Sequence, residues 1–135
     1  MEIEEALLAY LLTKAGLTAL IADRIYPDEA PQNTPLPYVT YMDVSNVPVH
    51  TLTGQYEYES PMKQFTAYAA TKSAAKSVAK QIKLALKDYQ GILSGIEIQY
   101  IKLENEMGDL ITTSDGTTKI FTHDLEYEIN YKKEA

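Results

Sequence analysis

Residues 119–131, with the sequence KIFTHDLEYEINY, alternate apolar and polar side chains more cleanly than any other segment of the chain. A period of two predicts a β-strand that buries one face and leaves the other in water. One face carries Phe121, Leu125, Tyr127, Ile129 and Tyr131, and the other carries Thr122, Asp124, Glu126, Glu128 and Asn130. An antiparallel sheet commonly has one packed and one solvated face, so a second layer must cover the apolar side of this strand.

Two amphipathic segments can supply this second layer. Residues 3–15 place leucines at helical spacing and begin with acidic residues, which the helix dipole favours in a first turn. Gly16 suits the end of this helix, and Thr18 is expected to cap a short following turn. Residues 72–89 form the clearest helix, with Thr71 as its expected N-cap and Gly91 as its stop. Its apolar stripe consists of Ala75, Val78, Ala79, Ile82, Ala85, Leu86 and Tyr89.

Three further strands are expected, at residues 38–44, at residues 62–69 and from about residue 96. A loop with four prolines, residues 26–37, precedes the first, and its last two prolines favour an extended approach. In the third strand, the apolar phase changes between Tyr100 and Ile101, which predicts a β-bulge. The sequence SDGT at residues 114–117 then predicts a hairpin turn.

The order of elements is therefore α-β-β-α-β-β within a single domain, residues 1–135. The expected fold is of the α+β class: a four-stranded, mainly antiparallel sheet with two helices packed on one face. Residues 45–59 form a long loop that we expect to be mobile, or alternatively a strand-extended hairpin arm.

Composition excludes several functional classes. The chain has 12 basic and 19 acidic residues, for a net charge of −7, and no cysteine. Disulfides and thiolate metal sites are therefore excluded, and tight nucleic-acid binding is disfavoured because no basic stripe is present. The lysines of residues 72–87 fall on the polar side of the predicted helix. The acidic N-terminal segment predicts no secretory signal, and no apolar run approaches the roughly 20 residues of a membrane span.

The sequence contains no motif for catalysis, and no cofactor is expected. Nucleophile-elbow, phosphate-loop, dinucleotide and zinc-protease patterns are missing from the sequence. His50 lies in the long loop, and His123 lies on the apolar phase of residues 119–131. A lone histidine in such a position is typically a hydrogen-bonded core or rim residue. We therefore do not expect an enzyme.

Two groups of residues are candidates for an interface. Asp124, Glu126 and Glu128 project from one face of a strand at intervals of about 6.6 Å. Three interpretations remain open: a solvated face, an intersubunit or channel-lining surface, and a cation site, for which one strand offers poor convergence of ligands. Tyrosine is over-represented, with 11 residues against two phenylalanines and no tryptophan. Tyr56 and Tyr58 lie in the long loop, and tyrosine is favoured at interfaces.

Four stretches, taken together, resemble the tail completion proteins of long, non-contractile-tailed bacteriophages, also called tail terminators or head-to-tail joining proteins. LLAYLLTKAGLTALIADRIYP resembles the N-terminal helix, short apolar turn and proline-containing loop of that family, and PLPYVTYMDVS resembles its first strand. QFTAYAATKSAAKSVAKQIKLAL resembles its strand and alanine-rich helix, and HDLEYEINYK its closing strand. Other members often have tryptophan where this chain has Tyr68. The resemblance covers nearly the full length.

The resemblance implies a structural virion protein without catalysis or cofactor. It implies a homo-oligomeric ring, expected to be a hexamer, at the head-proximal end of the tail, assembled in the host cytoplasm. The ring would cap the tail-tube protein and dock to the head-connector protein, while DNA passes through without specific binding; no membrane is involved. The alternatives are another phage neck or tail component of similar fold, and a monomeric small-molecule-binding or hydrolytic domain.

Overall fold

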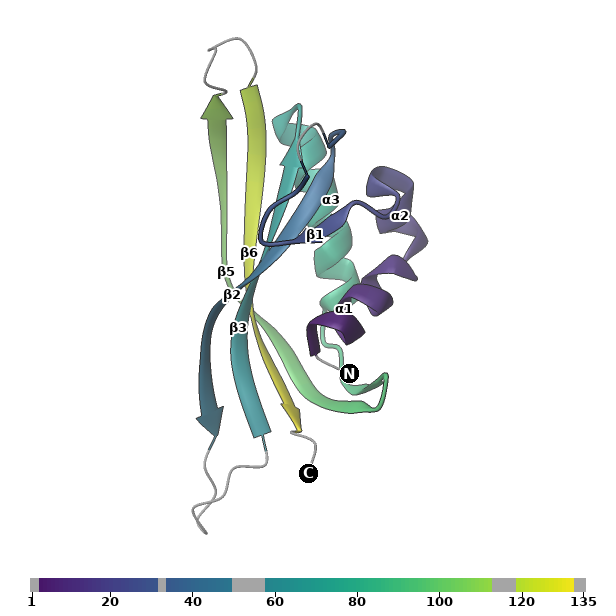
Figure 1. The fold of residues 1–135 in the computed structure, drawn as a ribbon, viewed down its shortest axis with the longest axis vertical. Helices are drawn as coiled ribbons and strands as arrows, with labels where there is room; N and C mark the ends of the chain where they lie inside the picture. Colours follow the sequence, from purple (N-terminus) through teal and green to yellow (C-terminus); the bar gives the residue numbers. More distant parts are fainter. Residues whose placement is uncertain (1–2, 32–33, 50–57, 113–118, 133–135) are drawn as a thin grey trace.

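The computed structural model describes residues 3–31, 34–49, 58–112 and 119–132, and shows a helical layer on one face of a long sheet (Figure 1). The helices are α1 (Ile3–Leu12), α2 (Ala15–Ile21) and α3 (Lys72–Leu86). The strands are β1 (Ile25–Pro27), β2 (Tyr38–Val49), β3 (Tyr58–Ala69), β4 (Gly91–Leu93), β5 (Ile96–Thr112) and β6 (Lys119–Lys132). They form one six-stranded sheet in the order β1-β2-β3-β6-β5-β4.

The expected four-stranded sheet with two helices is therefore wrong. The sheet is mixed, because β1 pairs in parallel with β2, with Ile25 opposite Val39. At the other edge, β4 pairs antiparallel with β5, with Gly91 opposite Ile98. Both missed strands have three residues, too few for a periodic pattern, and they exist because a longer strand lies beside them. The proline-containing loop accordingly begins after Pro27.

The third helix arises where one helix and a turn were expected. α1 ends at Leu12, and α2 begins two residues after Thr13. Thr18 is not a cap, because it lies inside α2, whose N-cap position is Lys14. Gly16 also lies inside α2. Leu17 is as fully buried as Leu11, so the apolar pattern continues across a break in the helix and conceals it.

Helix α3 forms as its sequence predicts. The Thr71 hydroxyl accepts a hydrogen bond of 3.1 Å from the Ala74 amide, which satisfies a free donor of the first turn. The buried residues of α3 are Ala75, Val78, Ala79, Ile82 and Leu86, five of the seven stripe residues. The helix ends at Leu86 rather than at residue 89, and Asp88 takes a left-handed φ of 53°. Gly91, expected to stop the helix, is the first residue of β4.

The core lies between the helices and one face of the sheet. Leu125, Tyr127 and Ile129 of β6 are buried there, and Phe121 is half-buried. Asp124, Glu126 and Glu128 occupy the opposite phase of β6 and are half-buried. The predicted orientation of this strand is confirmed. The phase change in β5 is also real, since its pairing with β6 shifts between Ile98 and Tyr100 and again between Leu103 and Asn105.

Two hairpins extend beyond the helical layer, at opposite ends of the sheet (Figure 1). In the β2–β3 arm, pairing continues to Val49 opposite Tyr58. In the β5–β6 arm, pairing continues to Thr112 opposite Lys119. Residues 45–49 and 58–59 of the expected loop are therefore strand, as in the hairpin-arm alternative. Residues 50–57 and the predicted turn at 114–117 lie outside the described part of the chain.

Candidate interaction surface

The sheet face opposite the helices has no helix packed on it in the described part of the chain, and we call it the open face (Figure 1). Alternation places on it the side chains that do not enter the helix-packed core. β2 and β3 contribute Tyr38, Thr40, Met42, Gln64, Thr66 and Tyr68, and β6 contributes Thr122, Asp124, Glu126, Glu128 and Asn130. The open face is thus polar in its centre and bounded along the strands by the two arms.

One half of the open face is closely packed, and the loop after β1 borders it, since Glu29, Pro31 and Leu36 line a pocket together with Tyr38, Thr40 and Tyr68. Thr40, Thr66 and Thr122 each expose only 6% of their surface. The rings of Tyr38 and Tyr68 stack with centroids 4.7 Å apart. Burial, with a smaller contribution from the neighbouring Tyr68, raises the pKa of Tyr38 above its ordinary value. This half therefore consists of tyrosine and threonine side chains, with Asp28 and Glu29 of the neighbouring loop beside them.

The other half of the open face carries the acidic row, Asp124, Glu126 and Glu128. The Tyr100 hydroxyl donates a 2.9 Å hydrogen bond to Glu128, and the Asn130 amide donates a 2.6 Å bond to the hydroxyl of Ser60. Burial and the hydrogen bond to Glu128 raise the pKa of Tyr100. Within the described ranges, no three acidic or histidine side chains converge on a point that could hold a metal ion. The acidic row is therefore a spaced line of negative charge, with Lys102 of β5 opposite Glu128 at one end of it.

A polar cluster on the helical side ties α3 to the β5–β6 arm. Glu106 of β5 accepts from Lys83 of α3 at 3.0 Å and lies 2.7 Å from Nε2 of His123 on β6. These two hydrogen bonds, that of His123 first, lower the pKa of Glu106 below its ordinary value. His123 exposes 9% of its surface, which confirms that it is a hydrogen-bonded residue at the rim of the core.

A second polar cluster ties α1 to the base of the β2–β3 arm. Lys63 of β3, only 4% exposed, pairs with Glu4 of α1 and Asp43 of β2. Burial lowers the pKa of Lys63, but the hydrogen bonds to Asp43 and Glu4 outweigh it and leave this pKa above its ordinary value. Sequence reasoning missed Lys63. The available signal was a single charge on the otherwise apolar phase of β3, which also holds Phe65, Ala67 and Ala69.

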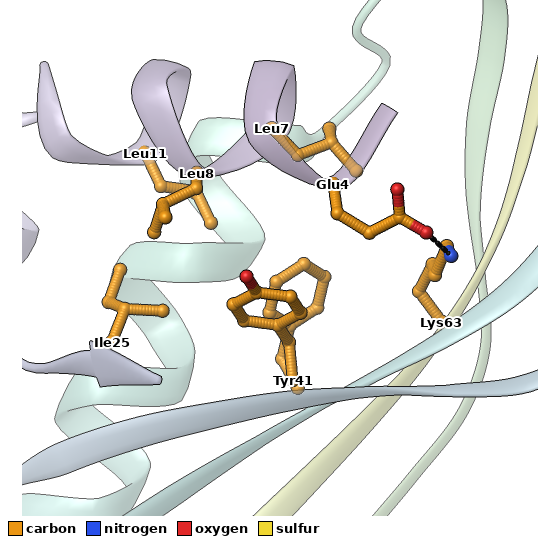
Figure 2. Close-up of a pocket in the computed structure, with 8 residues that line it drawn as sticks. Glu4, Leu7, Leu8, Leu11, Ile25, Tyr41 and Lys63 are labelled. Atoms are coloured by element: carbon orange, nitrogen blue, oxygen red, sulfur yellow. Dashed lines mark hydrogen bonds and ion pairs between the residues drawn. The ribbon is translucent and has the colours of Figure 1, made fainter. Parts of the chain in front are cut away.

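A small cavity lies beside the Lys63 cluster, with a volume of about 10 Å³, the room of roughly one water molecule. Figure 2 shows Leu7, Leu8 and Leu11 above it and Tyr41 below, with Glu4 reaching Lys63 at one side. The lining is almost wholly apolar and offers no room for an organic substrate. This cavity is a packing defect of the core.

The sequence-predicted interface residues separate into two groups. The acidic row comes together on one face, as predicted from its spacing. Tyr56 lies outside the described residues, as does the side chain of Tyr58, although the Tyr58 backbone begins β3. Sequence reasoning missed the exposed apolar residues near the arms, which are Met42, Val44, Met107, Leu110 and Ile111. The sequence held no signal for them, because their exposure depends on how far the neighbouring strands β1 and β4 extend.

No helix in the described ranges has the length and apolar character needed to cross a membrane. A comparison with curated protein sequences gives no match. Solved structures do match in fold. One is a chain from the virion of a native gene transfer agent particle, with 18% identity and a TM-score of 0.75 over 97% of this chain and 95% of that chain. Another is the gp17 protein of bacteriophage SPP1, with 19% identity and a TM-score of 0.50 over 97% of this chain and 88% of that chain.

The likeness to these structures concerns the fold, whereas the family is shown by a sequence model. The model of the family described as tail completion protein gp17 matches residues 5–131, nearly the whole chain. This match includes most of α1, the paired strands of both arms and the acidic row. The chain belongs to the tail completion protein gp17 family and is a structural component of the phage virion tail.

Proposed function

We propose that this protein closes the head-proximal end of the phage tail as a homo-oligomeric ring, expected to be a hexamer. In this position it stops polymerisation of the tail-tube protein and provides the surface to which the head connector docks. The observation that carries the proposal is the open face, a long uncovered sheet surface with an arm at each end, in a member of the tail completion family. A lone subunit leaves this surface without a partner.

The acidic row gives the ring a defined inner side in this proposal. Asp124, Glu126 and Glu128 project from the open face, and the whole chain carries a net charge of −7. Negative charge along a channel repels the phosphates of DNA and opposes adhesion. The open face therefore lines the lumen, and DNA slides past it without specific binding. The α3 lysines, on the opposite side of the molecule, then face outward.

The arms supply the axial contacts in this proposal. They extend the sheet in opposite directions beyond the helices (Figure 1), so one arm points toward the tail tube and the other toward the head. Tyr58 is the first residue of β3, and Tyr56 precedes it by two positions in the sequence. Tyrosine adds large contact area with a polar end. We assign these two residues to docking. Assembly takes place in the host cytoplasm, before head and tail join.

Deletion of the gene from its phage tests this function. We expect lysates to contain DNA-filled heads and unattached tails, with tails longer than normal, as seen by negative-stain electron microscopy. Adding the purified protein to such a lysate should restore joined particles. Normal tails that lack only a baseplate feature would instead indicate a different tail component of the same fold. Particles of unchanged structure and infectivity would contradict the proposal.

A further inference from the structure

The sheet has two strand segments whose outer edges are unpaired. β4 covers β5 only at Ile96–Ile98, and β1 covers β2 only at Val39–Tyr41. Among the described residues, no strand pairs with the outer side of β5 at residues 102–112 or of β2 at residues 42–49. An unpaired edge is a row of free amide and carbonyl groups, and it serves as a template for another strand.

We propose that neighbouring subunits join edge to edge, with the free edge of β5 in one copy pairing antiparallel with the free edge of β2 in the next. This inference rests on the proposed function, because it needs copies that close into a ring. It names the contact that builds the ring and the partner of each edge, which is a second copy of this chain.

Strand direction permits this pairing. β2 is antiparallel to β3, β3 to β6, and β6 to β5, so β2 and β5 run in opposite directions. A copy placed beside β5 in the same orientation therefore presents its β2 antiparallel to that β5. The contact is heterologous, since two different edges meet, and contacts of this type form closed rings when the rotation between copies is suitable.

The positions of the edges also fit a closed structure. The free edge of β5 lies on the β5–β6 arm, and that of β2 lies on the β2–β3 arm, at the other end of the sheet (Figure 1). Pairing them shifts each copy along the strand direction relative to its neighbour. A sheet that closes into a barrel requires such a stagger, with strands tilted to the axis. The resulting wall would carry the acidic row of every copy on one side.

The side chains beside the free edges are those expected of a contact. Exposed edges are usually protected by lysine or proline. On β5, the regular stretch beyond the Leu103/Asn105 shift has no lysine or proline, and it exposes 53% of Met107 and 45% of Ile111. On β2, Met42 and Val44 expose 44% and 47%. Pro48 provides no amide hydrogen, so we place the pairing at residues 42–47 of β2.

Engineered cysteines give a direct test, because the natural chain has no cysteine. We combine V44C with M107C, and in parallel M42C with D109C, which belongs to the same antiparallel register, in the full chain at assembling concentration. A short thiol crosslinker should give a covalent ladder on a denaturing gel, up to the subunit number of the ring. Each single-cysteine variant should stay at monomer mass. The matched control, L84C with M107C, replaces the edge position on β2 with an exposed site on α3 and should give no ladder.

Charge at the edge gives a second, independent test. The M107K/I111K variant should raise the concentration for half-maximal assembly by about tenfold or more, since it places lysines in a closed contact. The control L84K/I92K changes two apolar residues of similar or greater exposure, 58% and 70%, and should assemble as the wild type. Circular dichroism melting curves identify any variant that fails to fold. If M107K/I111K does not fold, the double-cysteine variants alone test the edge contact.

The two proposals fail in different ways. If the wild type forms rings, but no double-cysteine pair gives a ladder and M107K/I111K assembles normally, the edge contact is wrong while the ring stands. If light scattering finds only monomer at every concentration and on isolated tail tubes, the ring itself is wrong, and the edge contact with it. A ladder that stops at dimers would also overturn the edge contact, because a heterologous pairing does not end there.

Discussion

Lys63 is a charged side chain in an apolar face, and its surroundings decide whether it stabilises the fold. Its ammonium group loses water on folding, and burial alone would lower its pKa and favour the neutral amine. Glu4 and Asp43 restore the interaction from two different elements. Such pairs often contribute little net free energy of unfolding, yet they fix how elements meet. Here the pair holds α1 against the base of the β2–β3 arm.

This balance predicts opposite results for two variants of the Lys63 cluster. K63M keeps the volume and removes the buried charge, so the free energy of unfolding should stay within about 1.5 kcal/mol of wild type. The double variant E4Q/D43N leaves Lys63 buried without an acid and should cost about 3–5 kcal/mol. Urea denaturation measures both. A K63M loss as large as that of E4Q/D43N would show that the ion pair is itself a main source of stability.

The contribution of Glu106 to the stability of the fold depends on pH. Its pKa is lowered in the folded state, by His123 and Lys83, from an ordinary value of 4.5. The folded state therefore favours the charged form, and this contribution is present above pH 4.5 and is lost as the pH falls through the lower folded value. E106Q should melt below wild type at pH 7, and the difference should shrink below pH 4. A constant difference in melting temperature from pH 3 to 7 would contradict this role.

At the scale of elements, strong periodicity was the reliable guide. β6 and α3 follow their patterns to within three residues at each end, because burial of one face selects their register. β1 and β4 could not be predicted, since three residues carry no period and each depends on a neighbour brought by the fold. The outer part of β2, with Ser45, Asn46 and Pro48, has poor strand propensity and is strand through its pairing with β3.

The same contrast applies to the candidate surface. The acidic row could be predicted, because a period of two puts alternate residues of one strand on one face. The Lys63 cluster could not, because it joins three elements, and strand pairing decides which residues meet. The free edges were also hidden, since an edge is defined by how far the neighbouring strand extends. The sequence therefore predicted which residues of β6 lie on the open face, but not where the sheet has free edges.

The tip of the β2–β3 arm can be separated from its strands. Val49 and Tyr58 are already paired, so replacing residues 50–57 with Asp-Gly joins them through a two-residue hairpin turn. The replaced residues include Tyr56 and no residue of the described core. The melting temperature should change by only a few degrees. Ring formation should persist, because both free edges remain, whereas attachment of heads should be lost.

The opposite tip provides the matched control for this variant. Replacing residues 113–118 with Asp-Gly between the paired Thr112 and Lys119 shortens the other arm in the same way. Electron microscopy of particles from complemented lysates measures head attachment and tail length separately. We expect head attachment to fail when residues 50–57 are replaced, and to persist in the control with residues 113–118 replaced. Normal attachment with residues 50–57 replaced would remove Tyr56 from the docking surface.

The whole molecule is a sheet with two unlike sides. One side is covered by helices that expose lysines, and the other carries the acidic row in the open. In a ring with the open face inward, the lumen carries the acidic row, with Lys102 opposite Glu128, while the outside carries the lysines of α3. The position of the charged residues, rather than the net charge of the chain, then determines how easily DNA passes through the channel. This separation allows a charge change on one side to be compared with an equal change on the other.

Reversing the acidic row should therefore slow passage of DNA. The variant D124K/E126K/E128K changes the net charge from −7 to −1, because each of the three substitutions adds two positive charges. Lysines along the channel bind phosphates, so particles with this variant should eject DNA slowly or incompletely, and the defect should weaken as salt rises. The control E5K/D23K/D88K makes the same net change at exposed positions of the helical layer and should eject normally. Ejection is followed by fluorescence of a DNA-binding dye. Equal defects in both variants would mean that net charge alone acts, and normal ejection from the first variant would mean that the acidic row does not line the path of DNA.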